Sequence, residues 1–235
     1  MLDTGMARGL LLTPAAPKVP YQVEGLRREL NPDNSPRGES KDIRVESIDV
    51  FGKKFHNVAG AFSDWAIFST VPFEGAIGLD FFLDRRFTLD YHSKRIAVSR
   101  SPLPEGLDRH RYLVLDLIDP PGYQGHNLYA QALVNGRKAT IFLDTGLSQS
   151  SIDPAFGVGL PQIKPIGSRY PILRRGIPLE IDGRTFLLDD LSEDPIRRGT
   201  GFDHPVALSL GGDVLSCFIL TIDLRVKKLI LARAE

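Results

Sequence analysis

The chain contains one short pattern twice, and this internal repeat limits the folds that it can adopt. Asp-Thr-Gly occurs at residues 3–5 and again at residues 144–146, each time directly after a leucine. Downstream of each copy lies a short stretch that ends in glycine, at Gly78 and at Gly211. When these two glycines are aligned, the two halves match without a gap as far as Arg233. One unit of about 100 residues has therefore been duplicated, which differs from an array of many small repeats.

The local signals within both units are those of β-strands joined by tight turns. Asn135-Gly136 and Asp182-Gly183 are strong turn dipeptides between segments rich in apolar residues. Hairpins are predicted over residues 43–61, 87–98, 128–143, 178–188 and 220–231. Single helical turns are predicted after the two glycines, over 79–83 and 213–217, and a strand buried on both faces is predicted over 112–118. The expected fold class is all-β.

Two proline-rich stretches, 13–40 and 161–178, lie between Asp-Thr-Gly and the middle hairpin of their units. Clustered prolines without periodicity predict exposed loops. The functional alternative is a mobile flap over a binding site, because long loops on a rigid scaffold often carry binding. Tyr170 is a candidate flap tyrosine, with an ordinary surface aromatic as the other interpretation.

Composition argues against several classes of function. Lys plus Arg and Asp plus Glu both number 29, so no basic excess favours a nucleic acid partner. No apolar run approaches the roughly 18 residues of a membrane span. No His-Glu-x-x-His or paired-cysteine pattern supports a metal site. The single cysteine, Cys217, excludes an internal disulfide and lies in an apolar run, so we expect it to be a small buried hydrophobe.

The segment around the second Asp-Thr-Gly, residues 139–148, resembles an aspartic peptidase of the pepsin–retropepsin superfamily. The resemblance extends to residues 75–82, Gly-Ala-Ile-Gly-Leu-Asp-Phe-Phe, and to the hairpin over 87–98. It covers most of the second unit and the C-terminal half of the first. It implies two similar retropepsin-like β-barrel lobes with a cleft between them, and each lobe would contribute one Asp-Thr-Gly loop.

The resemblance also implies an endopeptidase whose catalytic dyad is Asp3 and Asp144, with a peptide or protein as substrate and no metal or organic cofactor. Two carboxylates about 3 Å apart share one proton, so the ionised one can activate a water while the protonated one donates to the peptide carbonyl. The other site residues implied by the resemblance support the dyad loops (Thr4, Gly5, Thr145, Gly146 and Ser148) or brace them from below (Gly78 and Gly211).

The first loop departs from this pattern. Ala7 occupies the position that matches Ser148, so a hydroxyl is missing there, and Arg8 would favour ionisation of Asp3 only if its side chain turned inward. Two alternative functions stay open on the sequence. One is a catalytically inactive binding module that keeps the peptidase fold. The other is a homodimeric peptidase that pairs the Asp144 loops of two chains.

The repeat divides the chain into a first lobe, residues 1–100, a linker, 101–111, and a second lobe, 112–235. Two strands' worth of sequence precede Asp144, whereas only two residues precede Asp3. We therefore expect a truncated first lobe that lacks its N-terminal strands, in which case the chain as written would be inactive. A short lobe completed by a partner's strands is the alternative. The compartment is not assigned, and an exported or periplasmic protein stays open.

Overall fold

The structure is a computed structural model that describes residues 1–6, 9–16, 19–30, 36–65, 73–120, 126–164, 172–196 and 201–233. The chain forms two compact units, Met1–Phe81 and Phe82–Glu235. Each unit contains one β-sheet, and helix is limited to single turns in the described part of the chain. The prediction of an all-β fold is confirmed.

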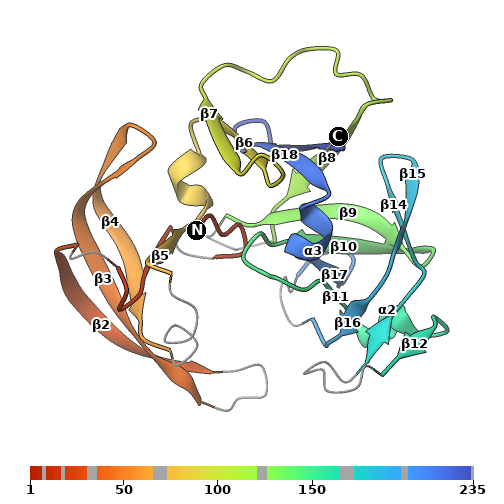
Figure 1. Ribbon diagram of the computed structural model, residues 1–235, viewed down its shortest axis with the longest axis horizontal. Helices are drawn as coiled ribbons and strands as arrows, with labels where there is room; N and C mark the ends of the chain where they lie inside the picture. Colours follow the sequence, from red (N-terminus) through yellow and green to blue (C-terminus); the bar gives the residue numbers. More distant parts are fainter. Residues whose placement is uncertain are drawn as a thin grey trace. The chain divides into compact units, whose positions relative to one another are not determined.

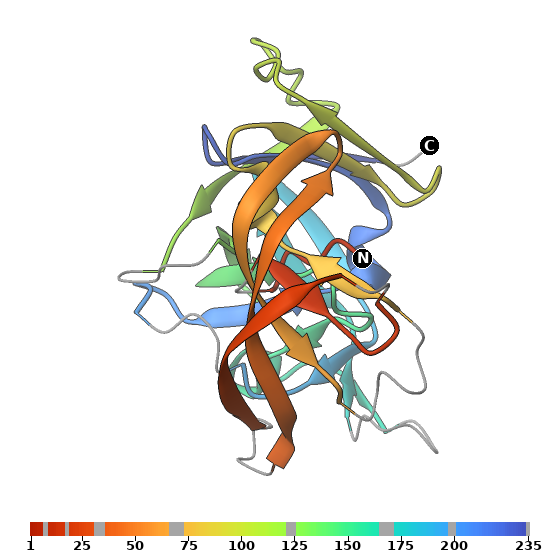
Figure 2. The same ribbon diagram turned by 90° about the vertical axis from the view of Figure 1, so that its left-hand side faces the viewer.

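The first unit is a five-stranded sheet in the order β2-β3-β4-β1-β5. Its strands are β1 (Leu10–Leu12), β2 (Tyr21–Leu30), β3 (Pro36–Val50), β4 (Lys53–Ser63) and β5 (Gly75–Ile77), and the 3-10 turn η1 (Leu79–Phe82) follows β5. The short strand β1 pairs parallel with β4 and antiparallel with β5. Figure 1 shows β2, β3 and β4 curving together, and Figure 2 shows how strongly they twist along their length.

The proline-rich stretch 13–40 is not the exposed loop that its sequence predicted. Most of it belongs to β2 and to the beginning of β3, which pair antiparallel from Tyr21↔Val45 to Leu30↔Pro36. Pro20 precedes β2 and Pro36 opens β3, so neither proline interrupts the middle of a strand, where its missing N–H would cost a ladder hydrogen bond.

The second unit holds the other fourteen strands in one sheet, with β12-β13-β16-β11-β17-β10-β9-β8-β19-β18-β6-β7 as its main order. The strands are β6 (Arg86–Asp90), β7 (Arg95–Ser99), β8 (Tyr112–Ile118), β9 (Leu128–Val134), β10 (Arg137–Leu143), β11 (Ser151–Ile152), β12 (Gln162–Ile163), β13 (Leu173–Arg174), β14 (Ile177–Ile181), β15 (Arg184–Leu188), β16 (Leu191–Glu193), β17 (Val206–Leu210), β18 (Phe218–Asp223) and β19 (Lys228–Arg233). Two helical turns, α2 (Pro154–Gly157) and α3 (Gly212–Leu215), complete it.

All five predicted hairpins are confirmed, as β3–β4, β6–β7, β9–β10, β14–β15 and β18–β19. The turn dipeptides explain two of them. Asn135 and Gly136 have φ of 50° and 73°, and Asp182 and Gly183 have φ of 49° and 72°. Two successive positive φ values match the right-handed twist of paired strands, and asparagine, aspartate and glycine tolerate them best.

The two copies of the last hairpin of the repeat pair with each other inside the second unit. Strand β6 lies antiparallel to β18, with Thr88 opposite Thr221, its counterpart in the duplication. Their hydroxyl groups are 2.9 Å apart. The contact therefore joins equivalent residues, and the two hairpins are related by a local two-fold arrangement around this pair.

Two predictions about burial are wrong. Strand β8 buries one face only, through Leu113, Leu115 and Leu117, because the residues between them lie on the partly exposed face. This alternation is not visible in the sequence, because Val114, on the partly exposed face, is also apolar. Cys217 is exposed, since it follows α3 in the short connection before β18.

Candidate active site

The second Asp-Thr-Gly follows β10, which runs parallel to β17. The backbone N–H of Asp144 donates to the carbonyl of Leu210 at 2.9 Å, and this bond ties the loop to the end of β17. The N–H of Gly146 donates to Oδ1 of Asp144 at 2.8 Å. Asp144 is only 4% exposed. This carboxylate is therefore held in one position by main-chain bonds on a buried strand end.

The first Asp-Thr-Gly is built by the same bonds in the first unit. The N–H of Asp3 donates to the carbonyl of Ile77 at 3.0 Å, and the N–H of Gly5 donates to Oδ1 of Asp3 at 2.9 Å. Leu2 forms a parallel bridge with Ile77, as Leu143 pairs parallel with Leu210 in the second unit. Asp3 is half-buried and Thr4 is fully buried. The duplication thus preserves the geometry around each carboxylate as well as the sequence.

The two glycines predicted to brace the loops lie against residues that follow the aspartates. The N–H of Gly78 donates to the carbonyl of Gly9 at 2.8 Å. A Cβ at Gly211 would come within 2.8 Å of the carbonyl oxygen of Leu147 and within 3.0 Å of its Cβ. Only glycine fits at Gly211, because a side chain would push the loop away from the strand.

The structure brings the predicted residues together in two groups. Asp144, Thr145, Gly146 and Gly211 lie around one loop of the second unit, and Asp3, Thr4, Gly5 and Gly78 lie around one loop of the first. Ser148 is exposed, and its hydroxyl makes no hydrogen bond within the described residues. Ala7 and Arg8, at the equivalent part of the first loop, lie outside the described residues, as does Tyr170.

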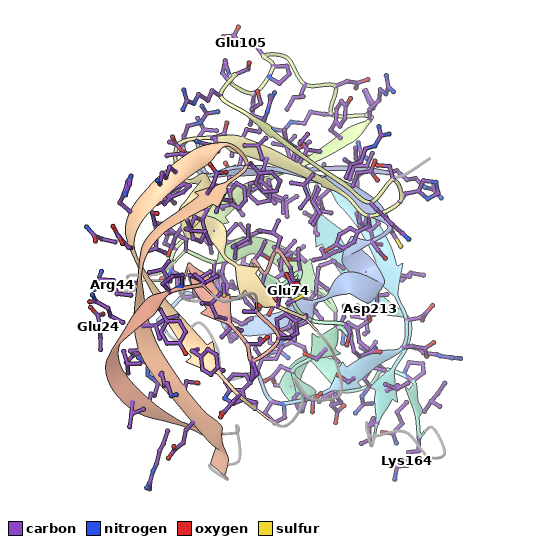
Figure 3. The ribbon with its side chains drawn as sticks, turned by 60° about the vertical axis from the view of Figure 1, so that its left-hand side comes forward. Glu24, Arg44, Glu74, Glu105, Lys164 and Asp213 are labelled. Carbon is purple, nitrogen blue, oxygen red and sulfur yellow. The ribbon has the colours of Figure 1, made fainter. Side chains whose placement is uncertain are left out.

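A different serine fastens the second loop. Ser150 is fully buried, and its hydroxyl donates to Oδ1 of Asp213 at 2.5 Å and accepts from the N–H of Gly211 at 2.8 Å. Figure 3 labels Asp213 at the first turn of α3. In the first unit Gly9 takes the place of Ser150, beside Asp80, the counterpart of Asp213. Sequence reasoning missed this pair, although the match of Asp80 with Asp213 in the repeat was a signal for it.

A second residue missed from the sequence is Tyr91, directly after β6. Burial, and to a smaller degree the negative charge of Asp144, raise the pKa of the Tyr91 hydroxyl to about 12. The oxygen of this hydroxyl is buried, and it has no hydrogen-bond partner in the described part of the chain. The equivalent residue of the second copy is Leu224, so the repeat gave no signal for a polar group here.

No group of three or more His, Cys, Asp or Glu side chains in the part of the chain that the structure describes is placed to hold a metal ion. No helix of the described residues has the length and apolar character needed to cross a membrane.

No protein-family model and no curated protein matches the chain in sequence. The fold itself is similar to that of the aspartic proteinases. A crystal structure of the aspartic proteinase from Irpex lacteus matches 100% of this chain and 89% of its own, with a TM-score of 0.63 and 10% sequence identity. At that identity the likeness establishes the all-β fold and not the activity.

Proposed function

We propose that the protein is an aspartic endopeptidase of the two-lobed, retropepsin-like type, in which Asp3 and Asp144 activate a water molecule between them. The observation that carries the proposal is the repeated loop geometry. Each aspartate follows a buried leucine, is tied to the neighbouring strand through its own N–H, and accepts a bond from the glycine two residues later. The aspartic proteinase fold of the solved neighbour supports the same interpretation.

In this proposal the lobes correspond to residues 1–100 and 112–235, joined by 101–111, and the substrate is a peptide in an extended conformation. One aspartate is ionised and removes a proton from the water, while the other, protonated, donates to the carbonyl oxygen of the scissile peptide. The water oxygen bonds to the carbonyl carbon and forms a gem-diol. Proton transfer to the nitrogen then lets the C–N bond break.

The supporting residues act on the position of these carboxylates. Gly5 and Gly146 donate to them. Gly78 donates its N–H to the carbonyl of Gly9, and Gly211 allows its loop to approach the strand beneath. Thr4 and Thr145 are proposed to link the two loops, and Ser148 is proposed to support the loop of Asp144. No metal or organic cofactor takes part in the proposed reaction.

The direct test replaces Asp144 with asparagine and measures cleavage of a fluorogenic peptide library between pH 3 and pH 7. We expect kcat to fall roughly 10²-fold to 10⁴-fold, because the asparagine can neither accept nor release the proton. Asp116→Asn is the matched control, since Asp116 is exposed on β8 and paired with Lys228. Undiminished cleavage by a folded Asp144→Asn protein would refute the dyad.

A second candidate function is a binding module that keeps the fold without catalysis. The structure favours it at one point, because Gly9 supplies no hydroxyl where Ser150 fastens the other loop. A weakly fixed Asp3 would lose activity and keep the binding groove. The two functions separate in one experiment, since a module would bind peptides with the wild-type sequence and cleave none of them.

A further inference from the structure

We propose that a pocket on the sheet of the second unit binds a small organic anion, in which a phosphate or a carboxylate is joined to a flat apolar body. The pocket has a volume of about 630 Å³ and lies between the turn after β6 and the beginning of β8. A volume of this size suits a small organic ligand. The inference does not depend on the proposed peptidase function, because none of the residues described as lining the pocket belongs to an Asp-Thr-Gly loop.

The floor of the pocket is one row of residues that crosses four neighbouring strands. Asp90 of β6 lies opposite Ile219 of β18, and Ile219 lies opposite Ala232 of β19. Ala232 in turn lies opposite Tyr112, on the partly exposed face of β8. Opposite residues of antiparallel strands share a face, and neighbouring strands are about 4.8 Å apart, so the row is roughly 14 Å long. The floor is therefore long enough for an aromatic ring with a substituent, and its middle is apolar.

The walls of the pocket carry two unpaired cations. Arg111 directly precedes β8, and its N–H donates to the carbonyl of Asp108 at 3.0 Å, which fixes its main chain. Arg233 is the last residue of β19. Neither arginine side chain forms a hydrogen bond or an ion pair with any of the residues that the structure describes. Because a guanidinium presents its donors in a planar fork that matches phosphate and carboxylate oxygens, two of them at one pocket favour an oxyanion.

One carboxylate, that of Asp90, also lines the pocket, and its own turn already satisfies it. The hydroxyl of Ser93 donates to Oδ2 at 2.5 Å, and the N–H of Ser93 donates to Oδ1 at 3.0 Å. These two bonds, the hydroxyl bond first, lower the pKa of Asp90, so it is ionised near neutral pH. Arg111 and Arg233 together outweigh this single negative charge, and His92 adds a further positive charge when it is protonated. The net charge of the pocket is therefore positive.

The equivalent place in the duplication is occupied by ion pairs. Asp223 is the counterpart of Asp90, and it lies opposite Arg86, the counterpart of Ile219. The guanidinium of Arg225 donates to both carboxylate oxygens of Asp223, at 2.8 Å and 2.6 Å. In the first copy an isoleucine stands opposite the aspartate in place of an arginine. Asp90 therefore borders an apolar floor, and the space above that floor is open to a ligand.

The binding test is an NMR titration of the full chain labelled with ¹⁵N, in which the arginine Nε–H resonances report on each guanidinium. The relevant resonances are identified by their absence from Arg111→Gln and Arg233→Gln. We expect phenyl phosphate or benzoate to shift both in a saturable manner, and each glutamine variant to raise Kd roughly 10-fold, because a charge-assisted hydrogen bond is lost. Arg100→Gln is the matched control, since Arg100 is the exposed counterpart of Arg233 and does not line the pocket. Its Kd should equal that of the wild type.

The choice of probe separates the two parts of the proposed ligand. Phenyl phosphate and benzoate distinguish a phosphate from a carboxylate, inorganic phosphate lacks the apolar body, and benzyl alcohol lacks the charge. We expect inorganic phosphate and benzyl alcohol to bind roughly 10-fold more weakly than the tighter of the two organic anions. Inorganic phosphate that binds as tightly as phenyl phosphate would overturn the role of the apolar floor. No saturable shift with either organic anion, or an equal loss of binding in Arg100→Gln, would overturn the proposal.

Discussion

At the scale of single residues, Gly211 is a position with little room for change. Gly211→Ala would bring a Cβ within 2.8 Å of the Leu147 carbonyl oxygen, so the chain after Asp144 must shift. We expect a loss of about 1–3 kcal/mol in the free energy of unfolding, measured by urea denaturation, with a parallel loss of peptide cleavage. Gly212→Ala is the control, because its Cβ would approach the same oxygen only to 3.4 Å. Equal stability of the two variants would contradict the steric argument.

Ser150 provides a second test at this scale. Ser150→Ala removes the bonds of the hydroxyl to Asp213 and to the N–H of Gly211. Asp213 keeps the bonds from the N–H of Ser150, whereas the buried N–H of Gly211 loses its partner. A buried group that loses its partner costs about 1–3 kcal/mol, so we expect a loss of that size in thermal or urea unfolding. Ser216→Ala, at an exposed serine just after α3, should change stability little. A neutral Ser150→Ala would show that the Ser150–Asp213 pair does not fasten the loop.

Single residues were predictable where the duplication repeats them. Asp144 and Gly211 each have an identical counterpart, so the sequence singled them out. Ser150 and Tyr91 are replaced by Gly9 and Leu224 in the other copy, and the importance of Ser150 comes from a bond to Asp213, which is distant in the chain. A comparison of the two copies could not reveal residues that serve only one of them.

At the scale of elements, the pairing of β6 with β18 can be measured through Thr88 and Thr221, whose hydroxyls are 2.9 Å apart. Replacing either threonine with valine keeps the shape and leaves one hydroxyl without its partner. We expect each single variant to lose about 0.5–1 kcal/mol, and the double variant to lose less than their sum. A double-mutant cycle of unfolding free energies measures this difference. Additive losses would mean that the hydroxyl pair adds nothing to the strand pairing.

The turn after β18 predicts a pH dependence of stability. Hydrogen bonds from the Arg225 guanidinium lower the pKa of Asp223 in the folded protein, and the positive charge of Arg225 adds to this shift, whereas burial opposes it. Folding therefore favours the ionised form of Asp223. Its contribution is present above the unfolded value of about 4 and is lost as the pH falls through the lower folded value.

We accordingly expect Asp223→Asn to destabilise the protein at pH 7 and to have a smaller effect at pH 3, because protonated aspartate resembles asparagine. Urea unfolding at both pH values checks this. Asp116→Asn is the control, since an exposed ion pair contributes little at either pH. A penalty for Asp223→Asn that does not decrease in acid would contradict the sign of the pKa shift.

Elements were predictable from sequence where tight turns mark them. The five hairpins depend on local turn residues such as Asn135-Gly136, and the structure confirms them. β2 was missed because prolines near its ends outweighed the strand signal between them. The one-sided burial of β8 was missed because its exposed face is also rich in apolar residues, and only the fold decides which face is covered.

At the scale of the whole molecule, the duplication and the compact units divide the chain at different places. The hairpin β6–β7 belongs to the first copy of the repeat, yet it lies in the unit Phe82–Glu235 because β6 pairs with β18. The alignment of the two copies groups segments by their common origin, whereas the compact units group segments that pair and pack together. The lobe boundaries at residues 100 and 112 therefore stay a prediction based on the duplication, and the compact units are defined by contacts in the structure.

The proposed dyad predicts a stoichiometry for the whole molecule. If each chain supplies both aspartates, a statine-type mimic of the gem-diol binds once per chain of 26.0 kDa. If the Asp144 loops of two chains pair instead, one mimic binds per two chains, and light scattering gives twice the mass. We expect one site per chain in calorimetric titration, because both copies of Asp-Thr-Gly make the same hydrogen bonds. Asp3→Asn then separates the two arrangements, since it would abolish binding in the single-chain enzyme and leave a dimer of Asp144 loops intact.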